Sequence, residues 1–555
     1  MKILNKTLLV LQIAFFAFCA LPARSEASGS ETVARRSPVI QAMLEELDRS
    51  KQQLQLQNLQ RPFFIEYRID DAAEWTAAAN YGAVSSERSS HQRVLRVVVR
   101  VGDYKADSKF GRGDGEVQLA ALDDDIPALR YALWNATDAA YKSALRAYAE
   151  KQAALKRFET SANASDFSRE PALISIGDVE HIDIDRDAWK HRVAELSGLF
   201  ATDKDVAMFS KDIQYSNASV RASVVNRYLV NSEGTIVRKA ITDYTAGVAA
   251  GTQAPDGMHL DRSYSRSATS AAGLDDAKTL QEKTVELLKT LRDLRVAPVV
   301  AEEYHGPVLF SGDASADVVR DLMLPNVVGA KPDMGTAART KGAYASSLKG
   351  RVLPAFISVT DDPTMESFDG QGLTGAYEVD DEGVKAQPVS IVMNGKLTNY
   401  LLGREPIEDF PASNGHGRAA IAQAATPSGA VLVVKSSTPE KTAELRQKLL
   451  NMARDEGRDV VYEVETVGPR LTPRLLYRID PKDGKRELVR GAEIDELDQR
   501  SLRSDIVAAG DDEWVANYSG AVPVTVISPS LLFGDITIKR ANDEQQKLPY
   551  YPPPS

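Results

Sequence analysis

The part of this sequence that most constrains the fold is the stretch from residue 376 to residue 419. Residues 388–393 form a short apolar run, Asn394-Gly395 suits a two-residue turn with positive φ, and residues 397–402 form a second apolar run. The stretch therefore predicts a β-hairpin. An acidic turn, Asp380-Asp381-Glu382-Gly383, precedes this hairpin, and a polar loop, Ser413-Asn414-Gly415-His416-Gly417-Arg418, follows it.

Length and charge exclude several classes of protein. The chain has 555 residues, 43% of them hydrophobic, which is too long for one core and predicts roughly two to four domains. The net charge of −11 argues against nucleic acid as a partner, because phosphate binding needs clustered Lys and Arg. We therefore expect an acidic globular protein that does not bind nucleic acid.

Residues 1–27 have the pattern of a secretory signal peptide. Lys2 and Lys6 stand before an apolar run over residues 8–21, and small residues follow where a signal peptidase could cut. The single cysteine, Cys19, lies in this segment, so the mature chain would fold without a disulfide. No later segment approaches the roughly 20 apolar residues that a membrane span needs. The sequence thus predicts export without a transmembrane segment.

The hydrophobic periodicity predicts an α+β class with antiparallel sheets and flanking helices, divided into three regions and a tail. Residues 28–165 are the expected amino-terminal α+β domain, with a first helix over 37–60, strands over 63–69, 75–84 and 94–101, and a long helix over 123–158. Residues 166–296 are the expected middle α/β region, with strands over 213–216, 222–231 and 235–245, a mobile linker over 263–273 and a helix over 275–294. Residues 297–545 are the expected carboxy-terminal β domain, with one inserted helix between Pro439 and Gly457, and residues 546–555 are a proline-rich tail.

Four features after residue 306 occur together in one known family. A strand over 306–310 leads into a helix over 314–324, the acidic turn and hairpin follow, the Asn-Gly-His-Gly-Arg loop comes next, and Val489-Arg490-Gly491-Ala492 precedes the closing strands. In these features the chain resembles the TldD/PmbA family, over roughly residues 63–540. The resemblance implies a strongly curved, barrel-like β structure for the carboxy-terminal domain.

The resemblance also shows what the sequence lacks. Active members of the family are metallopeptidases that carry HExxxH on the helix corresponding to residues 314–324, with two histidines on the metal and the glutamate as general base. Residues 319–324 here read Val-Arg-Asp-Leu-Met-Leu, with no histidine at either ligand position and Arg320 where the base would stand. The cysteine ligand expected near residues 517–520 is absent as well. The resemblance thus implies a metal-free member with no cofactor and no catalytic residue of its own.

The candidate substrate contacts lie in the acidic turn and the polar loop. His416 is flanked by glycines, so its backbone could approach a ligand closely; the alternative is a loop histidine that hydrogen bonds a neighbouring carbonyl. The acids could form a cation or acid/base cluster, or could be solvated turn residues. The predicted substrate-binding set is Asp380, Asp381, Glu382, Gly383, Asn414, Gly415, His416, Gly417 and Arg418.

Three functions remain open on the sequence. The first is a non-catalytic partner or peptide-binding subunit in envelope proteolysis, located in the periplasm. It would hold peptide or unfolded polypeptide by main-chain pairing, in a homo- or hetero-oligomer with a metal-bearing TldD-like subunit. The second is an active metallopeptidase with substituted zinc ligands, including His416 and the acids at 380–382. The third is an envelope scaffold that has kept the fold without peptide binding.

Overall fold

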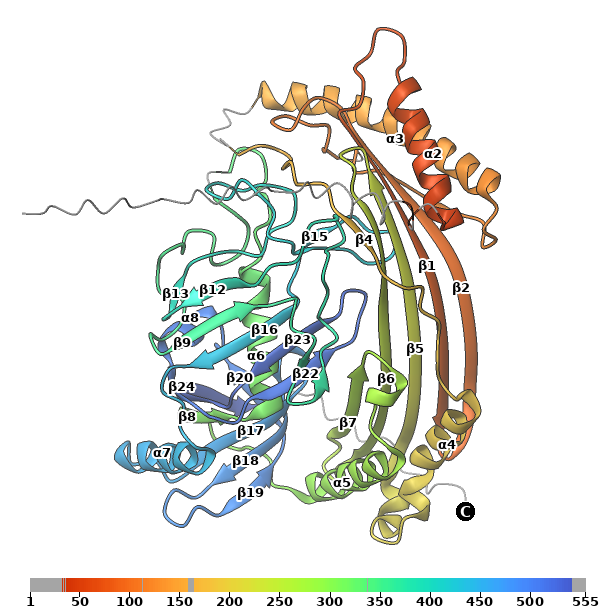
Figure 1. Cartoon of the computed structure of the whole chain (residues 1–555). Coiled ribbons are helices and arrows are strands. Elements are labelled where there is room, and N and C mark those ends of the chain that lie inside the picture. The colour runs from red at the N-terminus through yellow and green to blue at the C-terminus, as the bar shows by residue number, and fades with distance from the viewer. Residues whose placement is uncertain are drawn as a thin grey trace, which may run out of the picture.

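The computed structural model describes residues 36–541, except 112, 158–163 and 337, together with residues 32 and 34. The predicted signal peptide with Cys19 and the proline-rich tail lie outside the described residues. Figure 1 shows a long, curved sheet along the height of the molecule and the carboxy-terminal domain beside it. In the described part, no helix is long and apolar enough to cross a membrane.

Seven strands of the described chain form the long sheet. They are β1 (Phe64–Asn80), β2 (Ala83–Arg100), β3 (Glu116–Leu119), β4 (Ile174–Ile176), β5 (Ile213–Asn231), β6 (Ile236–Gln253) and β7 (His259–Ala268). The order is β3-β2-β1-β5-β6-β4, and β7 pairs with β6. The expected boundary near residue 165 therefore does not separate two sheets, because β1 pairs antiparallel with β5 from Glu66↔Asn231 to Asn80↔Asn217.

The strands of this sheet are longer than the sequence predicts. The run expected at 63–69 and most of the run expected at 75–84 belong to one strand, β1, and the second run continues through a turn at residues 81–82 into the start of β2. Asp70 and Asp71, which lie between them, do not form a turn: Asp70 accepts a hydrogen bond from Arg227 (2.6 Å), and Asp71 accepts one from Arg93 (3.1 Å). Cross-strand arginines thus satisfy the carboxylates that suggested a break in the strand.

The predicted mobile linker over residues 263–273 is also wrong. Its first half lies in β7, which pairs with β6 from Tyr244↔Ala268 to Gln253↔His259. Its Ser-rich composition suggested a linker, but alternate positions, Tyr264 and Ala268, pack against or into the core. A strand with a small polar outer face therefore has the composition of a linker.

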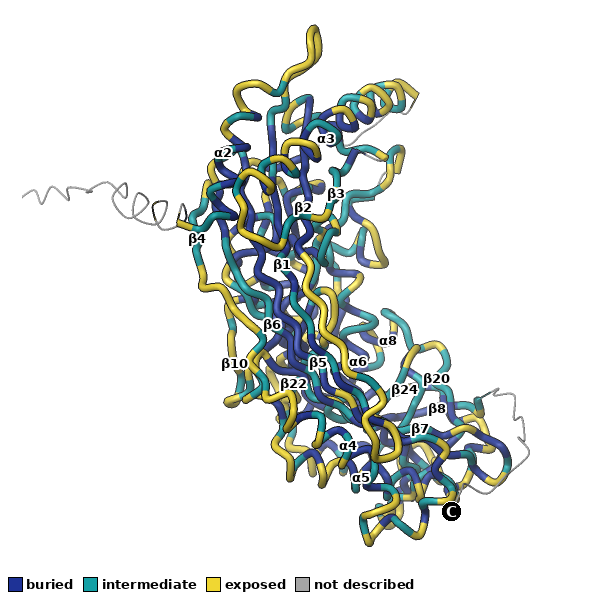
Figure 2. Tube along the Cα trace, turned by 90° about the vertical axis from the view of Figure 1, so that its right-hand side faces the viewer, coloured by how far each residue is buried: buried dark blue, intermediate teal, exposed yellow. Residues whose placement is uncertain are grey.

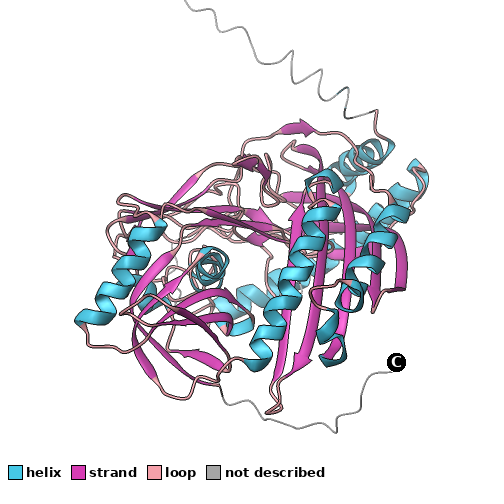
Figure 3. Cartoon of the chain, turned by 90° about the horizontal axis from the view of Figure 1, so that it is seen from below, coloured by secondary structure: helices cyan, strands magenta, loops and turns pink. Residues whose placement is uncertain are grey.

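The two faces of the long sheet differ because successive side chains of a strand point to opposite sides. On one side of β1, Ile65, Tyr67 and Ile69 contribute to a core with α2 (Pro38–Gln53) and α3 (Ile126–Leu155). Further along the same side, Trp75 contributes to a second core with α4 (Arg186–Thr202) and α5 (Ala277–Val296). Figure 2 shows buried residues along β1, β5 and β6, and Figure 3 shows helices lying against the long strands.

The helix ends follow from caps and burial. α3 begins after Asp125, whose side chain accepts a hydrogen bond from the Ala128 amide (2.7 Å), as the acidic start predicts. α2 ends at Gln53 rather than near residue 60. The buried stripe of α2 reaches only to Ser50, and residues 51–60 are mostly exposed, so no core stabilises a longer helix.

The carboxy-terminal domain is built on two mixed sheets. The first has the order β13-β12-β9-β16-β23-β22 and the second β19-β18-β17-β8-β24-β20, with β21 paired to β24. The strands of the first sheet are β9 (Ile357–Asp361), β12 (Val389–Met393), β13 (Lys396–Leu397), β16 (Val431–Ser436), β22 (Trp514–Tyr518) and β23 (Val524–Ser528). Those of the second are β8 (Tyr304–Phe310), β17 (Val461–Val467), β18 (Pro473–Ile479), β19 (Arg486–Val489), β20 (Ala492–Asp495), β21 (Ile506–Ala509) and β24 (Leu531–Arg540).

Helices and short strand pairs complete this domain. They are α6 (Gly312–Leu322), α7 (Thr442–Asp455), α8 (Gln499–Ser504), β10 (Ser367–Phe368) with β11 (Gln371–Gly372), and β14 (Gly417–Arg418) with β15 (Thr426–Pro427). The α+β class is confirmed. The two large sheets of this domain are separate, and the described strands close no barrel. The pairs β16–β23 and β8–β17 are parallel, since each is joined through a crossover rather than a hairpin.

The predicted hairpin is present. β12 ends at Met393, and Asn394 (φ 49°) and Gly395 (φ 77°) form the turn with the positive φ that the dipeptide predicts. The second strand, β13, is only two residues long. The inserted helix α7 begins at Thr442, later than predicted from Pro439, because the Glu440 amide bonds to the carbonyl of Ala509 and keeps this segment extended.

Candidate functional site

Two cavities lie between the long sheet and the carboxy-terminal domain. The α6 cavity, of about 700 Å³, is lined by β7, one face of α6, residues 466–469 and β22. The β4 cavity, of about 720 Å³, is lined by β4, β6 and residues 373–379. Asn517 ties the walls together, because its amide nitrogen donates to the carbonyls of Ser267 (3.3 Å) and Gly372 (2.9 Å). Both volumes are typical of ligand pockets.

Arg320 is fixed on the wall of the α6 cavity. Its guanidinium lies 3.0 Å from Oδ1 of Asp317 and 2.7 Å from Oδ1 of Asp321. Its Cζ lies 4.2 Å from the ring centroid of Tyr518, whose hydroxyl donates to Asp317 at 3.0 Å. The residue that stands where the resemblance puts the general base is therefore a cation held by two carboxylates and an aromatic ring.

Burial controls the proton affinities in this cavity. It raises the pKa of Asp317 to about 6, although Arg320 and the Tyr518 hydroxyl both lower it. Burial also raises the pKa of Asp313, one turn earlier on α6, and burial together with Asp317 raises the pKa of Tyr518. The carboxyl group of Asp317 is thus expected to titrate just below neutral pH.

A zinc ion does not fit these residues. The remaining expected ligand positions hold Val319 and Leu324, which are apolar, and residues 517–520, where Asn517 uses its amide oxygen to accept from the Thr374 amide (3.2 Å). Among the described residues, no three His, Cys, Asp or Glu side chains lie together in a way that could hold a metal ion. A guanidinium among carboxylates is unsuited to zinc, which takes neutral histidine, thiolate or carboxylate ligands.

The acidic turn and the polar loop, which the sequence places more than thirty residues apart, meet in the structure. Asp380 accepts hydrogen bonds from the amides of Gly417 (2.9 Å) and Val384 (2.8 Å). Asp381 accepts one from the Ala419 amide (2.7 Å). Both carboxylates are buried, so the expectation of solvated turn residues is wrong. They clamp the loop to the turn because buried backbone amides need acceptors.

Asp381 also joins the two parts of the molecule. Its Oδ1 lies 2.7 Å from Arg227 on β5 and 2.7 Å from Lys239 on β6. Arg227 in turn donates to Asp70 on β1 (2.6 Å), so three neighbouring strands of the long sheet take part. Burial alone would raise the pKa of Asp381, but Arg227, Lys239 and Arg418 together hold it well below its usual range. The group is an ionic anchor between the sheet and the carboxy-terminal domain.

The Glu382 side chain leaves no room for a Cβ atom at two glycines of the site. Its carboxylate accepts a hydrogen bond from the Arg404 amide (2.7 Å). A Cβ atom on Gly403 would lie 2.6 Å from that carboxylate, and one on Gly417 would lie 2.8 Å from its Cδ. Gly417 is therefore required by the packing of Glu382, not by the approach of a ligand. Burial and the neighbouring Asp380 raise the pKa of Glu382.

His416 is fully buried (0% exposed). Its Nδ1 lies 3.1 Å from both the carbonyl oxygen and the side-chain oxygen of Asn414, and its Nε2 lies 3.4 Å from Asp361. The expectation of a histidine bonded to a neighbouring carbonyl is confirmed. The imidazole lines neither the α6 cavity nor the β4 cavity, so direct contact with a ligand in either would require the loop to move.

The remaining members of the predicted set have structural partners too. Asn414 donates to the carbonyl of Tyr400 (2.8 Å), and Gly415 has a φ of 78°, where a Cβ atom would lie 2.9 Å from Cα of Ala386. Gly383 (φ 76°) forms the tight turn. Of the nine predicted residues, Asp381 and Arg418 line the β4 cavity. A binding role for the set stays a prediction.

Comparison of the sequence with known proteins shows which protein family the carboxy-terminal domain resembles. Residues 303–540 match the family model described as the PmbA/TldA metallopeptidase C-terminal domain. A metalloprotease of Methanocaldococcus jannaschii is 31% identical over 99 residues, which are 18% of this chain and 21% of that protein. The chain thus aligns with about a fifth of that relative's length.

Two solved structures share the overall fold. TldE from Thermococcus kodakarensis matches with a TM-score of 0.58 at 13% identity, over 90% of this chain and 99% of that one. A Thermotoga maritima protein described as a modulator of DNA gyrase matches with a TM-score of 0.58 at 13% identity, over 86% and 96%. The protein is therefore metallopeptidase-related. Its residues 303–540 belong to the PmbA/TldA metallopeptidase family, and the chain shares the fold of these two structures.

Proposed function

We propose that this chain is a metal-free, peptide-binding member of the TldD/PmbA family that acts beside a metal-bearing relative in envelope proteolysis. The observation that carries the proposal is Arg320, fixed by Asp317 and Tyr518 on the helix where the family resemblance expects the metal-binding motif. A guanidinium stays protonated in proteins and offers no lone pair to a metal ion. The pattern of residues 1–27 supports export to the envelope.

The free edge of β22 supports peptide binding. β22 is the last strand of its sheet and lines the α6 cavity along its whole length. An edge strand leaves main-chain amides and carbonyls unpaired on one side, and an extended peptide can pair with them. Trp514, at the start of β22, is 48% exposed and offers an apolar contact at the cavity mouth.

Metal content and cleavage test the non-catalytic role. The purified mature chain would be assayed for zinc and for cleavage of an unfolded reporter peptide, alone and mixed with a relative that carries HExxxH. We expect no stoichiometric zinc and no cleavage by the isolated chain. We expect cleavage in the mixture that is lost when the glutamate of the relative's motif is changed to glutamine. Stoichiometric zinc together with cleavage by the isolated chain would overturn the proposal.

Photo-crosslinking tests the binding site itself. A photoreactive residue at the exposed position Trp514 in β22 is expected to label bound peptide. The matched control is the same residue at Leu119 in β3, which is also exposed and also lies in an edge strand, but at the far side of the long sheet. Equal labelling at both positions would show that peptide does not use the α6 cavity.

A further inference from the structure

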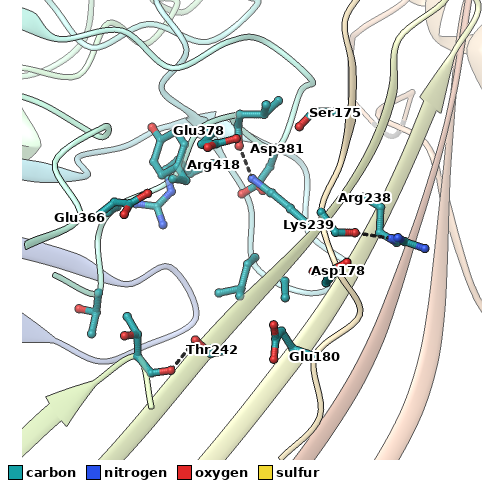
Figure 4. A pocket seen from close by; sticks show the side chains of 18 of the residues that line it. Ser175, Asp178, Glu180, Arg238, Lys239, Thr242, Glu366, Glu378, Asp381 and Arg418 are labelled. Atoms are coloured by element: carbon teal, nitrogen blue, oxygen red, sulfur yellow. Dashed lines mark hydrogen bonds and ion pairs between the residues drawn. The ribbon is translucent and has the colours of Figure 1, made fainter. Parts of the chain in front are cut away.

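The β4 cavity carries unpaired negative charge. Four carboxylates in its lining, Asp178, Glu180, Glu366 and Glu378, form no salt bridge with any residue that the structure describes. Figure 4 shows them on different sides of the cavity. Asp178 and Glu180 follow β4, whereas Glu366 and Glu378 belong to the carboxy-terminal domain, so the charges face the cavity from both of its walls.

The positive groups of the same lining have partners other than these four carboxylates. Lys239 lies 2.7 Å from Asp381, and Arg418 donates to the carbonyls of Gly429 (2.9 Å) and Pro523 (2.8 Å). Arg238 donates to the carbonyl of Gly177 (2.6 Å), and Figure 4 shows it directed away from Lys239. This opposite direction follows from the alternation of side chains along β6. None of these three cations forms a salt bridge with any of the four carboxylates, and the lining holds five acidic side chains against three basic ones.

A second observation points to a ligand. Thr374 is buried (6% exposed) and lines the cavity, and its hydroxyl has no hydrogen-bond partner among the described residues. A buried hydroxyl without a partner costs free energy unless a ligand or water satisfies it. The backbone amide of Thr374, by contrast, has a partner, because it donates a hydrogen bond to the side-chain oxygen of Asn517. The hydroxyl is therefore available to a molecule in the cavity.

The cavity also offers a main-chain edge. β4 pairs only with β6, from Ile174↔Ile236 to Ile176↔Arg238, and lies at the end of the long sheet. Its three residues are partly exposed and line the cavity or the adjoining hollow of about 490 Å³. An extended segment can add to this edge by backbone pairing.

We infer that the β4 cavity binds a positively charged peptide segment, with its backbone along β4 and its lysine or arginine side chains among Asp178, Glu180, Glu366 and Glu378. This inference rests on the proposed peptide-binding function and adds a substrate class to it. Charge complementarity would select basic sequences from a mixed pool of unfolded chains. The β4 cavity would then select basic segments, while the α6 cavity would hold the main chain of the same peptide further along.

The test compares three fluorescent peptides that differ only in charge, with lysine, glutamine or glutamate at the same positions, by anisotropy with the mature chain. We expect the lysine peptide to bind most tightly and to weaken as salt is raised. The double variant Glu366→Gln/Glu378→Gln is expected to weaken the lysine peptide by about three- to tenfold and to leave the glutamine peptide unchanged. Thr374→Val is expected to weaken both peptides.

A matched control is the double variant Glu282→Gln/Glu286→Gln, which removes the same charge from the exposed face of α5. It is expected to leave all affinities unchanged. Equal affinity for the three peptides, or an equal loss in the control, would overturn the charge selection while the proposed function stands. Failure of every peptide to bind would overturn both the charge selection and the proposed peptide-binding function. If spermidine bound and the lysine peptide did not, the ligand of the β4 cavity would be a small polyamine and not a peptide.

Discussion

The α-carbon of Gly417 faces the carboxyl group of Glu382 so closely that a Cβ atom there would lie 2.8 Å from Cδ and 2.9 Å from Cγ of Glu382. The carboxylate cannot easily step aside, because it accepts a hydrogen bond from the Arg404 amide and also fills the space beside Gly403. This contact locks the polar loop to the acidic turn.

Gly417→Ala is therefore expected to destabilise the protein by about 1–3 kcal/mol, the usual cost of overpacking a tight site. Urea denaturation would measure the change. Gly520→Ala is the control, since a Cβ atom at Gly520 meets no atom within 4 Å. Equal stability of the two variants would show that Glu382 relaxes freely.

Asp381→Asn tests the ionic anchor. The change leaves Arg227 and Lys239 without their shared carboxylate in a buried place, and such a loss costs about 3–5 kcal/mol. We expect a fall of this size in the free energy of unfolding. Asp293→Asn, which breaks an exposed pair with Arg292, should change it by less than about 0.5 kcal/mol. A similarly small effect at Asp381 would contradict the anchor.

Glu382 makes stability depend on pH. Its pKa is about 8 in the folded protein against an ordinary value of 4.5, so the folded state keeps the proton to higher pH than the unfolded chain. Below pH 4.5 both states are protonated and the group contributes no slope. Between pH 4.5 and 8 the unfolded state releases the proton first, so this group lowers stability as pH rises, and above pH 8 the loss is complete.

Glu382→Gln removes this titration and keeps an acceptor for the Arg404 amide. We expect the variant to lose less stability than the parent chain between pH 5 and pH 8, the interval set by the raised pKa, in urea unfolding at both pH values. Glu408→Gln, at an exposed position near the same loop, should follow the parent chain. Parallel pH profiles for Glu382→Gln and the parent would contradict the raised pKa.

Arg320→Gln changes the proton affinity of Asp317. Arg320 lowers the pKa of Asp317, so its loss is expected to raise that pKa further above about 6. Carbon-13 NMR of the aspartate side chains would follow the titration. Arg474→Gln is the control, because Arg474 lines the same cavity but pairs with Asp261. An unchanged Asp317 titration in Arg320→Gln would show that the pair does not form in solution.

Local signals in the sequence predict the elements well where the side chain that sets them is close in the chain. Asp125 caps α3 as its acidic start predicts, and Asn394-Gly395 makes the turn of the hairpin. The family resemblance locates α6 and predicts the loss of its metal site from Val319 and Leu324 at the histidine positions and Arg320 at the base position. These features need only a few neighbouring residues to specify them.

Long-range pairing is what the sequence does not reveal. Asp70 indicates a strand break until Arg227, far along the chain, is seen to pair with it. Asp381 resembles a solvated turn acid until Lys239 and Arg227 surround it. The carboxylates of the β4 cavity come from separate segments, so no local spacing brings them together. A basic residue within an otherwise apolar strand, such as Arg227, is the one available hint that a buried partner exists.

The place of β24 in its sheet has a consequence for the order of folding. The last strand of the long sheet ends at Ala268, whereas β8 and β20 in the carboxy-terminal domain both pair with β24, at Leu531–Arg540. A chain emerging amino-terminus first can complete the long sheet early, but the second domain must wait for almost its final residues. We therefore expect that domain to become resistant to proteases only after β24 has paired with β8 and β20.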